Sequence, residues 1–472
     1  MKHLLNIFII AALIMSSVAC DDFLTYAPSD AVDDTEAFKT AKDITNALNG
    51  VYYTLGRYEF YGRNVIATGD IAADNTYMLG TSGHFNDIYQ FTLNESTDYM
   101  MHMWEYGYKV LDRATRLITA GKALLAEGVT SGDEATIRAA IAQAYALKAL
   151  AHFTLVNIYG LPYSSSNTGS LGIVIIDEDI IPPFQEVHRS TVADAYAQVL
   201  KEIGLAKEGI SAAGSSAFHF NAAAVAALEA RVKLYMADWG GAISAAQSGI
   251  ELRKGSLVMT PSNYVNMWFD IVPTSEDIFT ISKTADDNLS ANSLNTLYGS
   301  YNGKATSGLI AIFAENDMRL GLFGDGTGEQ IRALKFDGLP SSKATSNIPV
   351  FRLPELYLII AEAKAQLGQA DAVDALFEVA RRNPDLQQSD IPTDKAGLLK
   401  FISAERRREL FQEGHRLFDL RRTGELMTRS GGNFPISNWD ASKFVYPIPA
   451  NEINASGLEQ NTGWSSALPP KS

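Results

Sequence analysis

Residues 221–252 read NAAAVAALEARVKLYMADWGGAISAAQSGIEL, and this stretch decides how the fold is interpreted. Small and large apolar residues recur at helical spacing on both sides of Trp239-Gly240-Gly241, where a turn is expected. The alternation lets two helices approach closely, because alanine and glycine on one helix leave room for the larger side chains of the other. The stretch therefore predicts a helical hairpin of the tetratricopeptide type.

A second hairpin is predicted at residues 351–384, FRLPELYLIIAEAKAQLGQADAVDALFEVARRNP. It has a first helix, a turn at Gly368 and a second helix from about Ala372 to Arg381. Further helical patterns begin at Thr35 and Ser190, both read as N-caps, at about Asp98, and at residue 133, the last ending at Gly160. The expected fold class is mostly α, with tetratricopeptide-like helix pairs scaffolding long irregular loops.

The stretch between the two hairpins has a different composition. Residues 261–350 are rich in Ser, Thr, Asn, Asp and Gly, with a strand-like piece at 277–282. A long irregular insertion is uncommon in a compact protein unless it has a function or is disordered. We therefore predict a helical region at 34–260 and a second region at 261–472, which contains the loop-rich insertion 261–350 and ends in an extended, turn-rich tail.

The amino end reads as an export signal. Lys2 and His3 precede an apolar run from Leu4 to Met15 and the small residues 16–19, so residues 1–19 are predicted to be a signal peptide. The run is shorter than the ~20 residues of a membrane-spanning helix, and no later stretch is expected to span. Cys20, the only cysteine, stands where bacterial lipoproteins are lipidated; the alternative is an ordinary signal peptide with an incidental cysteine. Residues 20–33 then form a lipidated tether.

Composition limits the class of partner. The formal net charge is -15, which makes the chain a poor partner for nucleic acid or anionic lipid and suits neutral ligands. Aromatic residues make up 10% of the chain and offer stacking surface. With one cysteine there is no internal disulfide, so burial of a large apolar core must stabilise the exported protein.

The chain resembles the SusD/RagB family of surface nutrient-binding lipoproteins. The resemblance spans nearly the whole mature chain and is carried, in order, by CDDFLTYAPSDAV (20–32), ALNGVYYTL (47–55), GDIAADN (69–75), AQAYALKALAHFTLVNIYGLPY (142–163), ALEARVKLYMADWGGAI (227–243), FRLPELYLIIAEAKAQLG (351–368), ERRRELFQEGHRLFDLRRTG (405–424) and YPIPANEINASGLEQNTGW (446–464). One departure is YKVLDRATRLI (108–118), where the family usually shows an asparagine near Thr115; we expect a local packing change there.

The resemblance implies a function and a location. Members sit on the outer leaflet of the outer membrane and pair with a SusC-like TonB-dependent transporter, over which they act as a lid. They capture oligosaccharide or, in RagB-like relatives, peptide. Asp21-Asp22 resembles the signal that sends such lipoproteins to the cell surface. The implied localisation is therefore the cell surface, with a lipid anchor at Cys20.

The densest charged cluster is AERRRELFQEGHRLFDLRRTG (404–424), read as one helix. One interpretation is an anion or metal site with His415 and the glutamates as ligands. The favoured interpretation is a half-buried helix whose arginines brace loop carbonyls and the tail. Within it, Glu405 with Arg408 and Glu413 with Arg416 are expected to form i,i+3 pairs.

Catalysis is the weaker hypothesis. Asp70 with Asp74, or the acidic run Asp177, Glu178 and Asp179, would suit a glycosidase only if two carboxyls faced each other across a bond. Capping is the commoner role for aspartates in turns. No zinc spacing and no phosphate-binding glycine loop is present. Structural calcium in the acidic loops stays an open alternative that no EF-hand spacing supports. We therefore predict a binding protein without cofactors; an exported helical glycosidase or lyase and a scaffold that binds only protein are the alternatives.

Sugar binding needs aromatic rings for the C–H faces of the sugar and polar side chains for its hydroxyls. Loops 75–99 and 264–302 combine both kinds of residue, whereas Trp104 and Trp239 lie in helical patterns and are assigned to the core. The predicted ligand contacts are Asn75, Tyr77, His84, Tyr89, Trp268, Asn295, Tyr298 and Tyr301.

Overall fold

The computed structural model describes residues 37–462, apart from 79–81, 183–184, 212–215, 325, 327 and 431–433. The predicted signal peptide, the tether 20–33 and Cys20 lie outside the described residues, as does Thr35.

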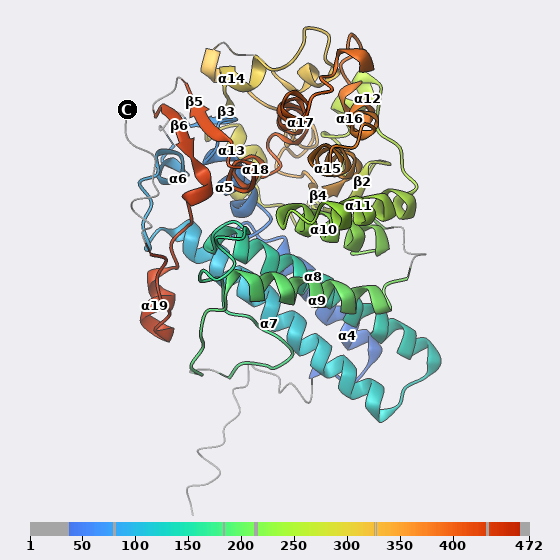
Figure 1. Ribbon diagram of the computed structural model, residues 1–472. Helices are drawn as coiled ribbons and strands as arrows, with labels where there is room; N and C mark the ends of the chain where they lie inside the picture. The colour runs from blue at the N-terminus through green and yellow to red at the C-terminus, as the bar shows by residue number, and fades with distance from the viewer. Residues whose placement is uncertain are drawn as a thin grey trace, which may run out of the picture.

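Four long helices form the base of the molecule: α4 (Ala41–Leu55), α7 (Asp98–Glu127), α8 (Ser131–Tyr159) and α9 (Val192–Gly209) (Figure 1). Helix α8 lies against the other three. It is long and apolar enough to cross a membrane, which the sequence analysis did not expect, but 83% of its apolar window is buried inside the protein. Its apolar character is therefore that of a core helix.

The helix starts lie at or near the predicted ones: α7 begins at Asp98, as predicted, and α8 begins at Ser131, two residues before the predicted start. Helix α4 begins at Ala41, where Thr40 and Asp43 form a reciprocal capping box. Helix α9 is capped by Thr191, whose hydroxyl accepts from the backbone N–H of Asp194. Ser190 is therefore not the cap; its hydroxyl donates to the carbonyl of Ile173 at 2.8 Å.

Both predicted hairpins are confirmed. The first consists of α10 (Ala222–Tyr235) and α11 (Trp239–Arg253), and the second of α15 (Leu353–Gln366) and α16 (Ala372–Ala380). The turn predicted at Trp239-Gly240-Gly241 is wrong: these residues begin α11, and the turn lies just before them, where Ala237 has a φ of 57°. Gly368 turns the second hairpin with a φ of 71°, which an L side chain rarely adopts. Helix α15 packs against α10 and α11, so the two hairpins are stacked (Figure 1). One continuous apolar core includes residues from both predicted regions; the boundary at 260 stays a prediction.

The strands are short and, within the described residues, form three antiparallel pairs. They are β1 (Thr76–Met78) with β3 (Gly303–Ala305), β2 (Asp277–Ile281) with β4 (Ile348–Arg352), and β5 (Leu426–Arg429) with β6 (Ile436–Asp440). The strand expected at 277–282 is confirmed. Short helices complete the chain: α5 (Asn64–Ile71), α6 (Asn86–Gln90), α12 (Pro261–Asn266), α13 (Leu294–Tyr298), α14 (Ser307–Ile310), α18 (Arg416–Thr423) and α19 (Ala450–Ser456), with α17 (Lys395–Leu410) the longer exception. Helix α19 lies inside the tail that was expected to be extended.

The arginine-rich segment is not one helix. It is split into α17 and α18, and the connection contains Gln412 and Gly414 at φ values of 61° and 81°. A side chain at 414 would lie 2.9 Å from the Cα of Ile66, so the chain turns where only glycine fits. The break separates Glu413 from Arg416, and the expected pair between them does not form.

The bracing role of these arginines is confirmed for loop carbonyls. Arg407 donates to the carbonyl of Asp74 at 2.9 Å, Arg408 to that of Ile312 at 2.9 Å, and Arg421 to that of Gly160 at 2.8 Å. The expected i,i+3 pair between Glu405 and Arg408 is present at 2.7 Å. The tail is held by another residue, Arg189, which donates to the carbonyl of Glu459 and to Asn461.

Buried ion pairs fasten the insertion 261–350 to α17 and to the connection that follows it. Arg319 contacts Glu405 at 2.6 Å, and Lys335 contacts Glu413 at 2.6 Å. Both insertion cations are fully buried. A buried charge is tolerated only when it is paired, so the irregular chain is held in place by charge compensation as well as by its small apolar cluster.

Candidate functional site

The pairing of β1 with β3 brings the two predicted ligand loops together. Tyr77 is the register partner of Lys304 in this pair. Two hydrogen bonds of Asn75 hold the start of β1. Its side-chain oxygen accepts from Arg407 Nε at 2.5 Å, and its backbone carbonyl accepts from the N–H of Thr306 at 2.9 Å. The arginine-rich segment thus positions the loops without entering their surface.

The clearest product of this pairing is a ring stack between the loops. His84 and Tyr301 have ring centroids 3.9 Å apart and planes 13° apart. Ser82 Oγ supports the stack by donating to the carbonyl of Tyr301 at 3.1 Å. Both rings are half-buried. Burial, and then the nearby charge of Arg63, lowers the pKa of His84, so its imidazole is neutral at pH 7.

Arg63 lies beside the stack and gathers further aromatic side chains. Its guanidinium carbon is 4.9 Å from the ring centre of Tyr58 and 5.3 Å from that of Phe85. Its Nη1 donates to the side-chain oxygen of Asn292 at 2.8 Å. Phe85 in turn stacks on Tyr99 with centroids 4.0 Å apart. We call the following residues the Arg63 cluster: Tyr58, Arg63, His84, Tyr99, Asn292 and Tyr301.

The Arg63 cluster has the composition of a sugar-binding surface. Apart from Arg63, which is 4% exposed, all its members are half-buried. Rings that are partly exposed offer faces to the C–H groups of a sugar, and the amide, hydroxyl and guanidinium groups between them bond to its hydroxyls.

Sequence reasoning found only part of this cluster. It named His84 and Tyr301, and it identified the loop that contains Asn292. Tyr58 and Arg63 were missed because the stretch was read as the end of a helical pattern. The sequence did contain a signal for these two residues. RYEFYGR (57–63), which follows directly after α4, contains three aromatic residues, one glycine and two arginines.

Four predicted contact residues are buried, and the expectation that they are exposed is wrong. Asn75, Tyr89, Trp268 and Tyr298 are 4% exposed or less. Two of them contact buried cations in the interior. The ring centre of Tyr89 lies 4.0 Å from the guanidinium carbon of Arg429, and the ring of Trp268 lies close to the cations of Lys335 and Arg352. Composition alone does not tell a loop on the surface from one covered by its neighbours.

The other two predicted residues are half-buried. Tyr77 lies on β1 with its ring 6.0 Å from that of Tyr89. Asn295 donates to the carbonyl of Asp337 at 3.1 Å. Together with His84 and Tyr301, they stay predictions as ligand contacts.

Asp70 and Asp74 lie in the interior and do not form a catalytic pair at the surface. Asp70 accepts from Thr76 Oγ1 at 2.9 Å and from Tyr298 OH at 3.1 Å, and burial raises its pKa to about 6. Burial would raise the pKa of Asp74 too, but Arg416 holds that pKa well below its usual range, with Arg416 Nε 2.8 Å from the carboxylate. Both carboxyls therefore serve to fix the chain.

The second acidic run is on the surface and is paired with lysines. Asp177 lies 2.7 Å from Lys201, and Glu178 lies 3.1 Å from Lys122. These contacts lower the pKa of both carboxyls, in Asp177 against the opposite effect of its partial burial. Neither is therefore suited to donate a proton near neutral pH, as a glycosidase acid must.

The alternative of a metal or anion site in the arginine-rich segment is not supported. His415 is buried, and burial lowers its pKa to about 4. Glu405, Glu409 and Glu413 are all engaged by arginine or lysine side chains. In the part of the chain that the structure describes, no group of three or more His, Cys, Asp or Glu side chains could hold a metal ion.

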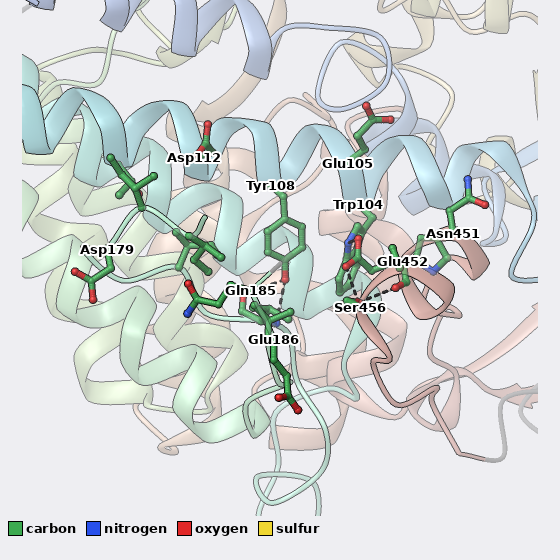
Figure 2. Close-up of a pocket in the computed structure, with 18 of the residues that line it drawn as sticks. Trp104, Glu105, Tyr108, Asp112, Asp179, Gln185, Glu186, Asn451, Glu452 and Ser456 are labelled. Atoms are coloured by element: carbon green, nitrogen blue, oxygen red, sulfur yellow. Dashed lines mark hydrogen bonds between the residues drawn. The ribbon is translucent and has the colours of Figure 1, made fainter. Parts of the chain in front are cut away.

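A large hollow lies elsewhere, between α7, residues of the segment 174–187 and α19, with a volume of about 840 Å³ (Figure 2). Trp104 and Tyr108 point into it from α7. Their polar atoms are already used: Trp104 Nε1 donates to Glu452 at 3.1 Å, and Tyr108 OH bonds to both backbone groups of Val174 at 2.9 Å. Because the polar atoms of these two rings are already bonded within the protein, we favour the Arg63 cluster as the candidate site.

Comparison with known proteins shows which families the sequence of this chain matches. Residues 22–234 match the sequence model of a SusD-like family described as starch-binding and associating with the outer membrane. Residues 331–464 match the model of the SusD family.

Relatives and solved structures agree with these matches. SusD-like protein P2 of Formosa agariphila is 24% identical and aligns over 96% of this chain and 98% of its own. The starch-binding protein SusD of Bacteroides thetaiotaomicron is 33% identical over 27% of this chain and 24% of its own. A SusD superfamily crystal structure from Bacteroides vulgatus superposes with a TM-score of 0.80 at 29% identity, covering 90% of this chain and all of the other.

Proposed function

Because this chain belongs to the SusD/RagB family, we propose that it captures oligosaccharide at the Arg63 cluster and delivers it to a TonB-dependent transporter in the outer membrane. The observation that carries the proposal is the half-buried stack of His84 on Tyr301, beside Tyr58 and Tyr99. Aromatic rings at a surface are the usual platform for the apolar faces of sugars.

The polar groups of the cluster support the same ligand class. Asn292 and the tyrosine hydroxyls can donate to and accept from sugar hydroxyls, and they are positioned by packing and by the β1–β3 pairing. A site held by packed neighbours loses little conformational freedom when it binds. The cluster is therefore suited to binding a ligand and releasing it unchanged.

Location follows from the amino end. We propose that Cys20 carries lipid and that residues 20–33 tether the helical body to the outer face of the membrane. Several acyl chains at about 0.8 kcal/mol per buried CH₂ would hold it stably. The family model described as associating with the outer membrane supports this part of the proposal.

Isothermal titration calorimetry of the purified protein against a panel of oligosaccharides and peptides tests the capture step. We expect saturable binding of at least one oligosaccharide series. A flat response to all glycans together with binding of peptides would replace the proposal with peptide import. Continued release of new reducing ends during incubation would instead indicate a glycosidase or lyase.

The delivery step needs a separate measurement. Co-purification of the tagged protein from outer membranes, with a TonB-dependent barrel identified in the same fraction, is the expected result. If the protein binds glycan but is recovered from membranes without any barrel, the capture function stands and delivery to a transporter is wrong.

A further inference from the structure

Arg63 is a buried cation that forms no ion pair with any residue the structure describes. It is 4% exposed, and it donates hydrogen bonds to two neutral amides, Asn64 at 3.0 Å and Asn292 at 2.8 Å. Among the described residues no carboxylate forms an ion pair with it. The two hydrogen bonds use its Nε and Nη1 atoms, and its Nη2 donates to none of the described residues. Burial lowers the pKa of Arg63, which reflects the unfavourable desolvation of its charge.

Other buried arginines in this protein are compensated in different ways. Arg319, Arg352 and Arg382 each contact at least one glutamate or aspartate. Arg421 and Arg429 form no ion pair with a carboxylate in the described part of the chain but donate to backbone carbonyls, two of them in the case of Arg421. Arg63 differs from both groups because its acceptors are side-chain amides and it borders the half-buried rings of the candidate site.

A second cation lies on the strand pair that joins these loops. Lys304 lies on β3, three residues after Tyr301, and donates to the carbonyl of Gly299 at 3.3 Å. Burial, and then the charge of Arg332, lowers the pKa of Lys304. The nearest acidic group on the Arg63 segment, Glu59, is already paired with Arg57 at 3.1 Å.

We propose that the glycan bound at the Arg63 cluster carries anionic groups, carboxylate or sulfate, and that the guanidinium of Arg63 binds them. A planar guanidinium can donate two parallel hydrogen bonds to a carboxylate or sulfate. The bound anion would then supply the negative counter-charge that the described residues do not provide. The net charge of -15 led us to expect a neutral ligand. The local arrangement reverses that expectation. This inference rests on the proposed glycan-binding function.

Calorimetry with three oligosaccharide series of equal length tests it: neutral glucans, polyuronates and sulfated galactans. We expect at least one anionic series to bind tenfold or more tightly than the neutral one, with affinity falling as NaCl rises from 50 to 500 mM, in the range where salt screens charges. The series that binds more tightly identifies the anion as carboxylate or sulfate.

Two variants separate charge from packing. Arg63→Met should lower the affinity for the anionic series at least tenfold, while Arg63→Lys, which keeps the charge, should lower it less. If Arg63→Met does not fold, Arg63→Lys and the salt dependence decide. Tight binding of the neutral series, unaffected by salt and by Arg63→Lys, would overturn this inference and leave the proposed function intact. Absence of binding to all three series would overturn both.

Discussion

His84 and Tyr301 come from two loops that meet at the same end of the β1–β3 pairing, where Met78 pairs with Gly303, and their rings stack with centroids 3.9 Å apart. This contact joins the two halves of the chain at a surface. It is the relationship on which the glycan-binding proposal depends, because neither loop alone forms a platform.

Replacing Tyr301 with alanine removes one ring of the platform. We expect Tyr301→Ala and His84→Ala each to weaken oligosaccharide binding about tenfold, equivalent to about 1.4 kcal/mol, with little change in the unfolding midpoint. Tyr106→Ala, which removes a half-buried tyrosine from the middle of α7, is the matched control and should bind normally. Equal losses in all three variants would contradict a specific role for the stack.

Trp268 tests whether a buried aromatic contacts the ligand. Its side chain is 4% exposed and lies between Lys335 and Arg352. We expect Trp268→Ala to lower the free energy of unfolding by about 3–5 kcal/mol, as for other large core truncations, measured by urea denaturation. A variant of unchanged stability that no longer binds glycan would show that the ring contacts the ligand after all.

The pair of Asp74 and Arg416 tests the structural role of the arginine-rich segment. Removing Arg416 leaves the buried carboxylate of Asp74 with only the longer contact to Arg407, at 3.6 Å, so Arg416→Ala should cost about 3–5 kcal/mol of stability. Arg381→Ala, which breaks an exposed pair with Glu378, should cost less than about 1 kcal/mol. Chemical denaturation of both variants gives the comparison; similar small losses would mean that the buried pair does not hold the start of β1.

Asp70 predicts a pH dependence of stability. Its pKa is raised from 3.8 to about 6 by burial, so between these values the folded state binds more protons than the unfolded state. Stability attributable to this group is therefore highest below pH 3.8 and falls as the pH rises through 6, by roughly 3 kcal/mol in all. We expect Asp70→Asn to show a smaller fall in unfolding free energy between pH 4.5 and 7 than the parent protein. Parallel curves would contradict a raised pKa.

The lipid anchor is tested on the full chain. Cys20→Ala should move the protein from the membrane to the soluble fraction, since a single cysteine provides the only thiol for lipidation. Its thermal midpoint should be unchanged, because the tether lies before the helical body. A variant that still sediments with membranes would place the anchor elsewhere.

Much of the fold was accessible from the sequence because it depends on neighbours along the chain. The hairpins at 221–252 and 351–384 were predicted by the spacing of small and large apolar residues. The family resemblance, carried by motifs such as ALEARVKLYMADWGGAI, predicted the helical scaffold and the binding class. The break between α17 and α18 was missed, because the left-handed turn at Gly414 is required by contact with Ile66, which is remote in sequence.

The candidate site was decided by tertiary structure. The sequence by itself determined that two loops contain aromatic and amide residues, which includes His84 and Tyr301. Only the folded chain showed that Trp268 and Tyr298 are buried and that Arg63 joins the site. The physical reason is that burial and charge compensation depend on what packs over a loop, and those partners, such as Arg352 over Trp268 and Asn292 beside Arg63, come from distant parts of the chain.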